Sequence, residues 1–256
     1  MAAPAVGGIR VKDRPLDGAL ELFVENNNLA AATLTVEVFG ENATPDRPVP
    51  LIFSCPGKGA FPFLRLRPVE GGRDFGYRVR YSWQFGATGV RHDPRVVYDL
   101  PVAPRSRLRV MQGPGGSFTH TGNNLHAVDF GMPEGTPVHA ARAGVVEVVV
   151  DRFSEGGEDP SLRDHVNMIL VRHPDGTYAE YVHLMRQGAK VRPGQKVRAR
   201  QLLGLSGNTG YSQGPHLHLA VFRAVDGMVR ETFPLRFRCR EGTGLELVEG
   251  EVYTAP

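Results

Sequence analysis

Short stretches in which apolar and polar residues alternate, separated by turn residues, dominate this chain of 256 residues. Residues 32–39 read Ala-Thr-Leu-Thr-Val-Glu-Val-Phe, and residues 77–85 place five aromatic or aliphatic side chains on one face of an extended strand. A period of two is typical of half-buried β-strands. The 31 glycines and 20 prolines add frequent turns. The sequence therefore predicts an all-β protein.

The first part of the chain, residues 1–104, is expected to form a small β-sandwich-like accessory domain. Turn residues separate many of its strand-like runs at intervals of roughly ten residues, as in sandwiches. Three asparagines at positions 26–28 predict a hairpin-like turn. Trp83 and its aromatic neighbours fit a core stripe better than a binding face. The predicted strands cover residues 19–25, 32–39, 50–54, 63–67 and 77–85.

Prolines at positions 101 and 104 end this pattern, and residues 105–256 are expected to form a second β domain. No window of twelve residues there has a clean helical period. The Asp175-Gly176 pair predicts a tight turn that joins two strands into a hairpin. The predicted strands cover residues 105–110, 144–150, 167–172, 178–184, 202–205 and 216–222.

Charge and cysteine content exclude several kinds of protein. The net charge is +3, but the basic residues are spread along the chain without a run, so no nucleic-acid partner is expected. No stretch approaches the ~18 apolar residues of a membrane span. Cys55 and Cys239 form no Cys-x-x-Cys pair, which argues against a thiolate zinc site. They could form one disulfide or remain buried thiols.

Eight of the nine histidines follow residue 105, and two of them occupy alternate positions of one strand. Side chains alternate across a strand, so His216 and His218 project from the same face. The preceding segment, residues 204–215, contains four glycines and a proline and predicts a tight loop at the entrance of that strand. A His-x-His pair of this kind can supply two imidazoles to a metal site.

Asp129 is the candidate carboxylate ligand, and two histidines compete to be its partner. His126 lies three positions away, so a regular strand would direct the two side chains to opposite faces. His120 lies nine positions away across a loop that can fold back toward Asp129. Side-chain parity therefore favours His120 over His126.

His183 ends another predicted strand, on the same face as Ala179 and Tyr181. Two imidazoles and one carboxylate satisfy three positions of a tetrahedral zinc site and leave the fourth for water. Zinc lowers the pKa of a bound water toward about 7. Two further histidines could accept its proton and stabilise an oxyanion.

Five segments in order resemble the lysostaphin-type, or LytM-domain, zinc metallopeptidases: HAVDFGMPEGTPV, YVHL, VRPGQKV, GLSGNTG and GPHLHLAV. The resemblance covers about residues 113–224 and implies an antiparallel β-sheet with a groove. It implies that Asp129 and His218 are zinc ligands, and that His183 and His216 are catalytic. The family's common first ligand would fall on Leu125, but the segment FTHTGNNLHAVDF resembles a subgroup with a Ser/Thr-His further upstream, which again selects His120.

The resemblance implies a zinc endopeptidase, with one zinc ion per chain, that hydrolyses peptide cross-links or stem peptides of bacterial peptidoglycan. Asn208 and Tyr211 are expected to line the substrate groove. A non-catalytic LytM-type regulator that activates a cell-wall amidase is the alternative, and a cytosolic zinc-binding module is a third. The enzyme is expected to be a periplasmic or extracellular monomer, with its export signal absent from this sequence, because the first residues lack the regions of a signal peptide.

Overall fold

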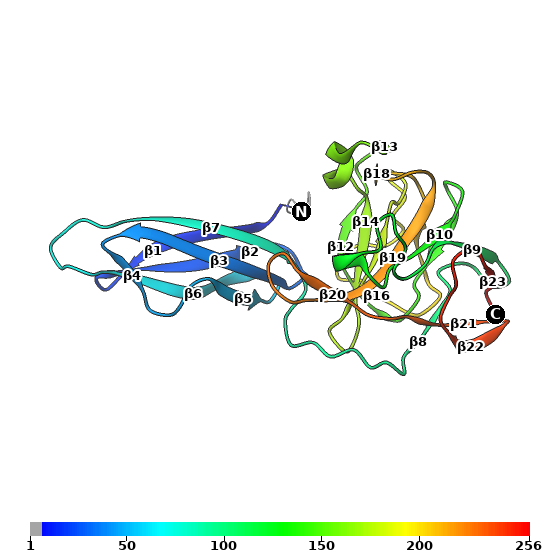
Figure 1. Ribbon diagram of the computed structural model, residues 1–256, viewed down its shortest axis with the longest axis horizontal. Helices are drawn as coiled ribbons and strands as arrows, with labels where there is room; N and C mark the ends of the chain where they lie inside the picture. The colour runs from blue at the N-terminus through cyan, green and yellow to red at the C-terminus, as the bar shows by residue number, and fades with distance from the viewer. Residues whose placement is uncertain (1–6) are drawn as a thin grey trace. The chain divides into compact units, whose positions relative to one another are not determined.

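The computed structural model describes residues 7–256, and β-strands make up nearly all of its regular structure (Figure 1). The helices among these residues are two short 3-10 turns, η1 (Gly122–Asn124) and η2 (Pro160–Asp164). The all-β prediction is confirmed. No helix in the described part of the chain has the length and apolar character needed to cross a membrane.

The chain forms two compact units. Unit 1 comprises Met1–Gly89 and Ala224–Arg230, and unit 2 comprises Val90–Arg223 and Glu231–Pro256. A short segment of the C-terminal half thus completes the N-terminal unit, where the Gly227 backbone N–H donates to Thr35 Oγ1 at 2.9 Å. The domain boundary predicted at residue 104 stays a prediction.

Unit 1 consists of two antiparallel sheets, which correspond to the predicted β-sandwich (Figure 1, blue to cyan). The first sheet has the order β1 (Ile9–Leu16), β2 (Ala19–Asn26), β6 (Gly59–Pro68), β4 (Ala43–Pro45). The second has the order β5 (Leu51–Cys55), β3 (Ala32–Glu41), β7 (Gly76–Phe85). Trp83 is 9% exposed and packs edge-on against Phe85 with ring centroids 5.2 Å apart, so it belongs to the core as predicted.

The predicted hairpin at the three asparagines is wrong. β2 pairs with β1 and β6, whereas β3 pairs with β5 and β7, so the chain crosses from one sheet to the other at this point. The Asn26 side chain is fully buried and donates to the carbonyls of Ala30 and Pro56, each at 2.9 Å. The buried Asn26 side chain therefore satisfies backbone carbonyls at the crossover, a use of asparagine that the local sequence does not distinguish from an exposed turn.

Unit 2 is built on one large sheet whose path runs antiparallel from strand to strand. Its order is β16 (Lys196–Val197), β12 (Gly144–Val150), β14 (Met168–Arg172), β15 (Tyr178–Val182), β19 (His216–Ala224), β10 (Val128–Gly131), β9 (Arg107–Gln112), β23 (Val252–Thr254), with β20 (Arg230–Thr232) beside β19. The hairpin predicted at Asp175-Gly176 is confirmed by the pairing of β14 with β15, and Gly176 has a φ of 85°.

Three small sheets complete unit 2. They are β11 (Pro137–His139) with β17 (Leu202–Leu205), the parallel pair β13 (Gly156–Gly157) with β18 (Gly210–Tyr211), and β22 (Gly242–Leu245) with β21 (Arg236–Cys239) and β8 (Val97–Asp99). The strands after residue 224 were not predicted, because each is only three or four residues long.

One face of the large sheet is apolar and the other is polar where β10, β15 and β19 meet. Val128, Phe130, Leu217 and Leu219 are at most 2% exposed and belong to the main core cluster. Alternation along the strands sends Asp129 and His218 to the opposite face. Burial of the apolar residues in the core therefore determines that the Asp129 and His218 side chains lie on the other face of the sheet.

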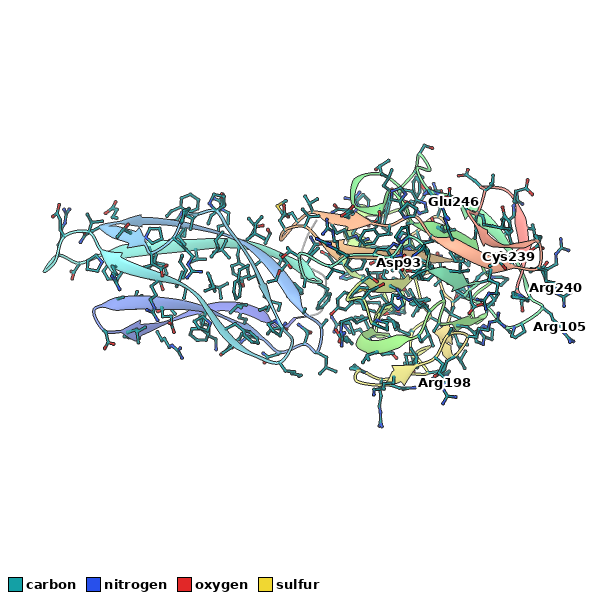
Figure 2. The ribbon with its side chains drawn as sticks, turned by 90° about the horizontal axis from the view of Figure 1, so that it is seen from below. Asp93, Arg105, Arg198, Cys239, Arg240 and Glu246 are labelled. Atoms are coloured by element: carbon teal, nitrogen blue, oxygen red, sulfur yellow. The ribbon has the colours of Figure 1, made fainter. Side chains whose placement is uncertain are left out.

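The two cysteines are free thiols, so the structure contains no disulfide between them. Cys55 ends β5 in unit 1. Cys239, which Figure 2 labels, ends β21 in unit 2. Both side chains are buried, and burial raises the pKa of Cys239 to about 11. A thiol with this pKa is a core residue rather than a nucleophile.

Candidate metal and catalytic site

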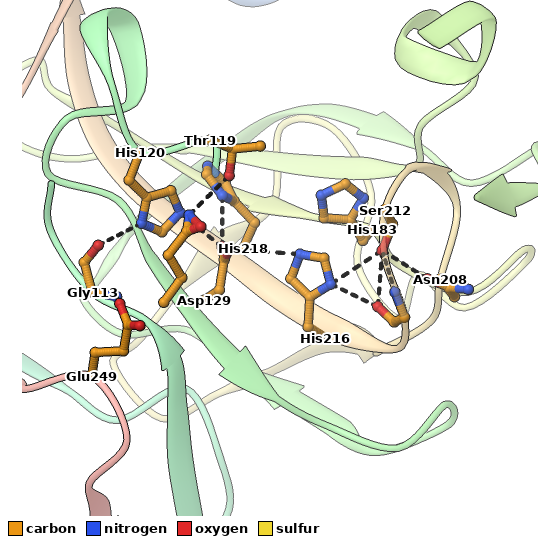
Figure 3. A network of polar contacts seen from close by, with 12 residues as sticks. Gly113, Thr119, His120, Asp129, His183, Asn208, Ser212, His216, His218 and Glu249 are labelled. Atoms are coloured by element: carbon orange, nitrogen blue, oxygen red, sulfur yellow. Dashed lines mark hydrogen bonds and ion pairs between the residues drawn. The ribbon is translucent and has the colours of Figure 1, made fainter. Parts of the chain in front are cut away.

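Asp129 and His218 face each other across two neighbouring strands. They form a register pair of β10 and β19, so their side chains leave the same face of the sheet. His218 Nδ1 lies 2.9 Å from Asp129 Oδ1 (Figure 3). Both residues are buried, with 6% and 7% exposure.

His120 reaches the same carboxylate from the loop between β9 and β10. Its side chain is fully buried, and Nε2 lies 3.1 Å from Asp129 Oδ1. His120 Nδ1 donates to the Gly113 carbonyl at 2.8 Å. The Gly113 backbone N–H in turn donates to Glu249 Oε2 at 3.2 Å. The folded loop therefore directs one ring nitrogen of His120 toward Asp129 (Figure 3).

The structure places His126 elsewhere. Its side chain is half-buried, and its backbone N–H donates to Thr232 Oγ1 at 3.1 Å. His120, which side-chain parity favoured over His126, is the histidine that lies beside Asp129.

These side chains fit a divalent cation. His120, Asp129 and His218 each offer one ligand atom, and the three atoms lie within 4.8 Å of one another. His120 Nδ1 carries the proton of the hydrogen bond to the Gly113 carbonyl, so Nε2 directs a lone pair toward the Asp129 carboxylate oxygen. This buried Nε2 has no hydrogen-bond partner. Two acceptors that face each other repel unless a cation or a proton lies between them. Two imidazole nitrogens and a carboxylate are ligands that zinc prefers.

His183 and His216 form a second pair next to this cluster, with ring centroids 4.4 Å apart. His183 Nδ1 donates to the Thr209 carbonyl at 2.7 Å, and His216 Nδ1 donates to the Gly214 carbonyl at 2.8 Å. Each ring therefore keeps its Nε2 free of the proton. His216 Nε2 lies 3.9 Å from Asp129 Oδ2, toward the candidate metal ligands.

The predicted orientation of His183 is wrong. Continuous alternation would place it with Tyr181, which is fully buried in the core. Instead β15 ends at Val182, and His183 has a φ of 65°, in the left-handed region. This single residue interrupts the alternation and brings the imidazole beside His216.

The surroundings give the buried groups very different proton affinities. Burial lowers the pKa of His183 to about 3, and the adjacent His216 adds to the effect. Burial also lowers the pKa of His216. For His218 burial acts in the same direction, but contacts with Asp129 and Glu180 outweigh it and raise the pKa to about 9.

Asp129 shows the opposite balance. Burial alone would raise its pKa, yet the close contacts with His120 and His218 hold the pKa far below its usual value. Asp129 is therefore ionised at neutral pH, as a metal ligand must be.

The two residues predicted to line the groove lie near the second histidine pair. Asn208 lines a cleft and accepts a hydrogen bond from Ser212 Oγ at 2.8 Å. Tyr211 stacks on Phe118 with ring centroids 5.9 Å apart, and the Arg163 guanidinium lies over the Tyr211 ring, 5.2 Å from its centroid. Contact with a substrate stays a prediction for both. The cleft is lined by Glu134, Ser154, Gly156, Met185, Arg186, Asn208 and Thr209.

Sequence reasoning missed Glu180 and the backbone carbonyls of Gly113, Thr209 and Gly214. Glu180 Oε1 lies 3.3 Å from His218 Nε2, and both side chains are 8% exposed. A lone acid within the apolar strand Tyr-Ala-Glu-Tyr-Val was the available signal, because a buried carboxylate needs a partner. Every residue has a backbone carbonyl, so the residue type gives no sign of which carbonyls accept from the histidines.

Comparison with known proteins points to one family. Residues 123–229 match Peptidase family M23. The matched span contains Asp129, His183, His216 and His218, and His120 lies three residues before it.

Individual relatives agree with this match. The chain is 29% identical over 150 residues to an uncharacterized metalloprotease of Buchnera aphidicola, covering 58% of this chain and 36% of the relative. It is 38% identical over 93 residues to the peptidoglycan DD-endopeptidase ShyA of Vibrio cholerae, covering 36% of this chain and 19% of the relative. The chain therefore spans only about a fifth to a third of the length of these relatives.

A solved structure of the lysostaphin catalytic domain from Staphylococcus simulans is 27% identical and covers 50% of this chain and 88% of that chain, with a TM-score of 0.34. A TM-score this low supports no structural argument, so the assignment rests on the sequence match. Residues 123–229 of this chain are a domain of peptidase family M23.

Proposed function

We propose that the protein is a zinc-dependent endopeptidase that hydrolyses peptide cross-links or stem peptides of bacterial peptidoglycan. The observation that carries the proposal is the convergence of His120, Asp129 and His218 next to two half-buried neutral histidines. The family match supports peptidase activity, and the relative named as a peptidoglycan endopeptidase suggests the substrate class. Since peptidoglycan lies outside the cytoplasm, we propose a periplasmic or extracellular location and a monomer as the working form.

The three clustered side chains would hold one zinc ion per chain through His120 Nε2, an Asp129 oxygen and His218 Nδ1. A bound zinc ion supplies Lewis-acid chemistry, polarising the scissile carbonyl and lowering the pKa of a water molecule. The carbonyl of Gly113 keeps the His120 ring in the tautomer whose Nε2 lone pair faces Asp129.

The His183 and His216 pair would move the protons. Both rings donate a hydrogen bond from Nδ1–H to a backbone carbonyl, so each presents an unprotonated Nε2. The low pKa values keep both rings neutral at pH 7, ready to accept a proton from the attacking water. The ring centroids are only 4.4 Å apart, so two positive charges on the pair would repel each other. The pair therefore binds a first proton more readily than a second. The protonated ring can then stabilise the oxyanion and return the proton to the departing amine nitrogen.

Defined muropeptides and glycine-rich peptides, analysed by mass spectrometry with and without a chelator, test the proposal. We expect cleavage that a chelator abolishes and added zinc restores. His218→Ala should lose stoichiometric zinc, whereas His183→Ala should keep zinc and lose turnover by about 10²–10⁴-fold, the usual contribution of a general base. Stoichiometric zinc without cleavage of any of these peptides would contradict the enzyme proposal. Absence of zinc together with tight amidase binding would instead support the regulator alternative.

A further inference from the structure

The four histidines of the site are not anchored in the same way. His120, His183 and His216 each donate from Nδ1 to a backbone carbonyl, which leaves Nε2 for chemistry. His218 is reversed, because Nδ1 points at Asp129 and Nε2 points away from the cluster. The nitrogen turned away from the cluster is the one that must hold a proton if Nδ1 is to bind a metal.

Glu180 is the group that meets this reversed ring. Its Oε1 lies 3.3 Å from His218 Nε2, and each side chain is 8% exposed. In the antiparallel pairing of β15 with β19, Val182 is opposite His218 and Glu180 is opposite Ala220. Glu180 is therefore the diagonal neighbour of His218 on the same sheet face, a position within reach of a long side chain.

The position of His218 inside a strand explains why its ring N–H meets a side-chain carboxyl group, whereas the other three histidines donate to backbone carbonyls. His218 lies inside β19, which pairs with β10 on one side and β15 on the other. The carbonyls of such a strand are used in the sheet hydrogen bonds. The other three histidines lie in a loop, after the last residue of a strand and at the first residue of a strand, where carbonyls of nearby loops are accessible.

We propose that Glu180 is a positioning residue that accepts the Nε2 proton of His218 and so fixes the ring with Nδ1 toward the metal. The inference rests on the proposed zinc site. A carboxylate behind a ligating imidazole orients the ring and raises its basicity, and loss of such a partner costs 10–100-fold in metal affinity. Glu180 also brings a second buried negative charge to balance a divalent cation beside Asp129.

Zinc affinity of the variants, measured by competition with a chromophoric chelator at fixed pH, tests the inference. We expect Glu180→Ala to bind zinc 10–100-fold more weakly than the unaltered chain. Glu180→Gln keeps an acceptor oxygen in a side chain of equal size, so we expect it to lose less than about tenfold. Glu147→Gln is the matched control, because Glu147 is a 9% exposed acid of β12 in the same sheet whose partners are Arg172 and Tyr178. It should bind zinc like the unaltered chain.

A spectroscopic readout separates ring orientation from general loss of stability. In the zinc-loaded chain, long-range proton–nitrogen spectra should show the His218 proton on Nε2, retained in Glu180→Gln and broadened by solvent exchange in Glu180→Ala. Unaltered zinc affinity in Glu180→Ala would overturn the inference. Equal losses in Glu180→Gln and Glu180→Ala would also overturn it, because they would indicate direct ligation by the carboxylate. If the unaltered chain binds no zinc, the proposed metal site itself fails, which is a distinct result.

Discussion

At the scale of single residues, the surroundings and not the residue type decide what each histidine does. Burial with a neighbouring imidazole lowers the pKa of His183 to about 3. Two carboxylates raise the pKa of His218 to about 9, although the ring is buried as well. At pH 7 the imidazole is therefore neutral at position 183 and protonated at position 218.

The raised pKa of His218 predicts that zinc uptake releases a proton. At pH 7, below the pKa of about 9, His218 carries protons on both nitrogens, and Nδ1 must lose its proton to bind zinc. We expect about one proton released per zinc from this residue, and an affinity that falls roughly tenfold per pH unit below about pH 9. Titration calorimetry in two buffers of different ionisation enthalpy measures the release.

His183→Ala is the control for this measurement, because it leaves the three candidate ligands in place and should release the same number of protons. An enthalpy that does not depend on the buffer, together with a constant affinity between pH 6 and pH 8, would contradict the prediction.

At the scale of elements, tight contacts between backbone segments hold the second histidine pair. The parallel pair β13–β18 sets Gly156 opposite Gly210, next to Thr209, whose carbonyl anchors His183. A Cβ on Gly156 would lie 1.4 Å from the Asn208 carbonyl oxygen, closer than two non-bonded atoms can approach. Glycine at this position is therefore required by the close approach of two backbones rather than by a turn.

Gly156→Ala is expected to displace the segment that carries Asn208 and Thr209. Because that segment anchors His183 and not the metal cluster, zinc should remain bound while turnover falls by about tenfold or more. Peptide cleavage and zinc content measured on the same preparation check this.

Gly157→Ala is the matched control, because its Cβ would meet only Leu162 Cδ1 at 3.8 Å, an ordinary contact. Turnover of Gly156→Ala equal to that of Gly157→Ala would show that the close approach is not needed for catalysis.

At the scale of the whole molecule, the candidate site lies in one of the two units of the chain. The candidate ligands and catalytic histidines all belong to unit 2, whose core cluster includes Tyr98, Leu100 and Val102. Those three side chains are at most 3% exposed and precede the boundary predicted at residue 104. β8, which contains Tyr98, also pairs with β21.

Two fragments locate the boundary. One that begins at Val90 should unfold cooperatively, whereas one that begins at Arg105 should be several kcal/mol less stable. Burial of each large apolar side chain contributes about 1.5–3 kcal/mol, and the shorter fragment lacks three of them. Urea denaturation followed by circular dichroism compares the two, which share every residue from 105 onward. Equal stability would place the boundary at residue 104, as predicted from the prolines.

The sequence by itself determined the all-β class, most strands longer than four residues, and the face shared by His216 and His218. These features depend on alternation within one strand, which is a local property of the chain. The resemblance to the lysostaphin-type peptidases pointed to Asp129 as a candidate ligand, and side-chain parity favoured His120 over His126 as its partner.

Only the tertiary structure decided the rest. The sequence favoured His120, but the contacts with Gly113 and Glu249 that hold its loop against Asp129 are tertiary. A left-handed residue turns His183 out of the core face. Strand pairing sets Glu180 behind His218, and a buried Asn26 converts an expected hairpin into a crossover between sheets. Each of these depends on contacts between segments distant in sequence or on one backbone dihedral, and neither leaves a period in the sequence that could predict it.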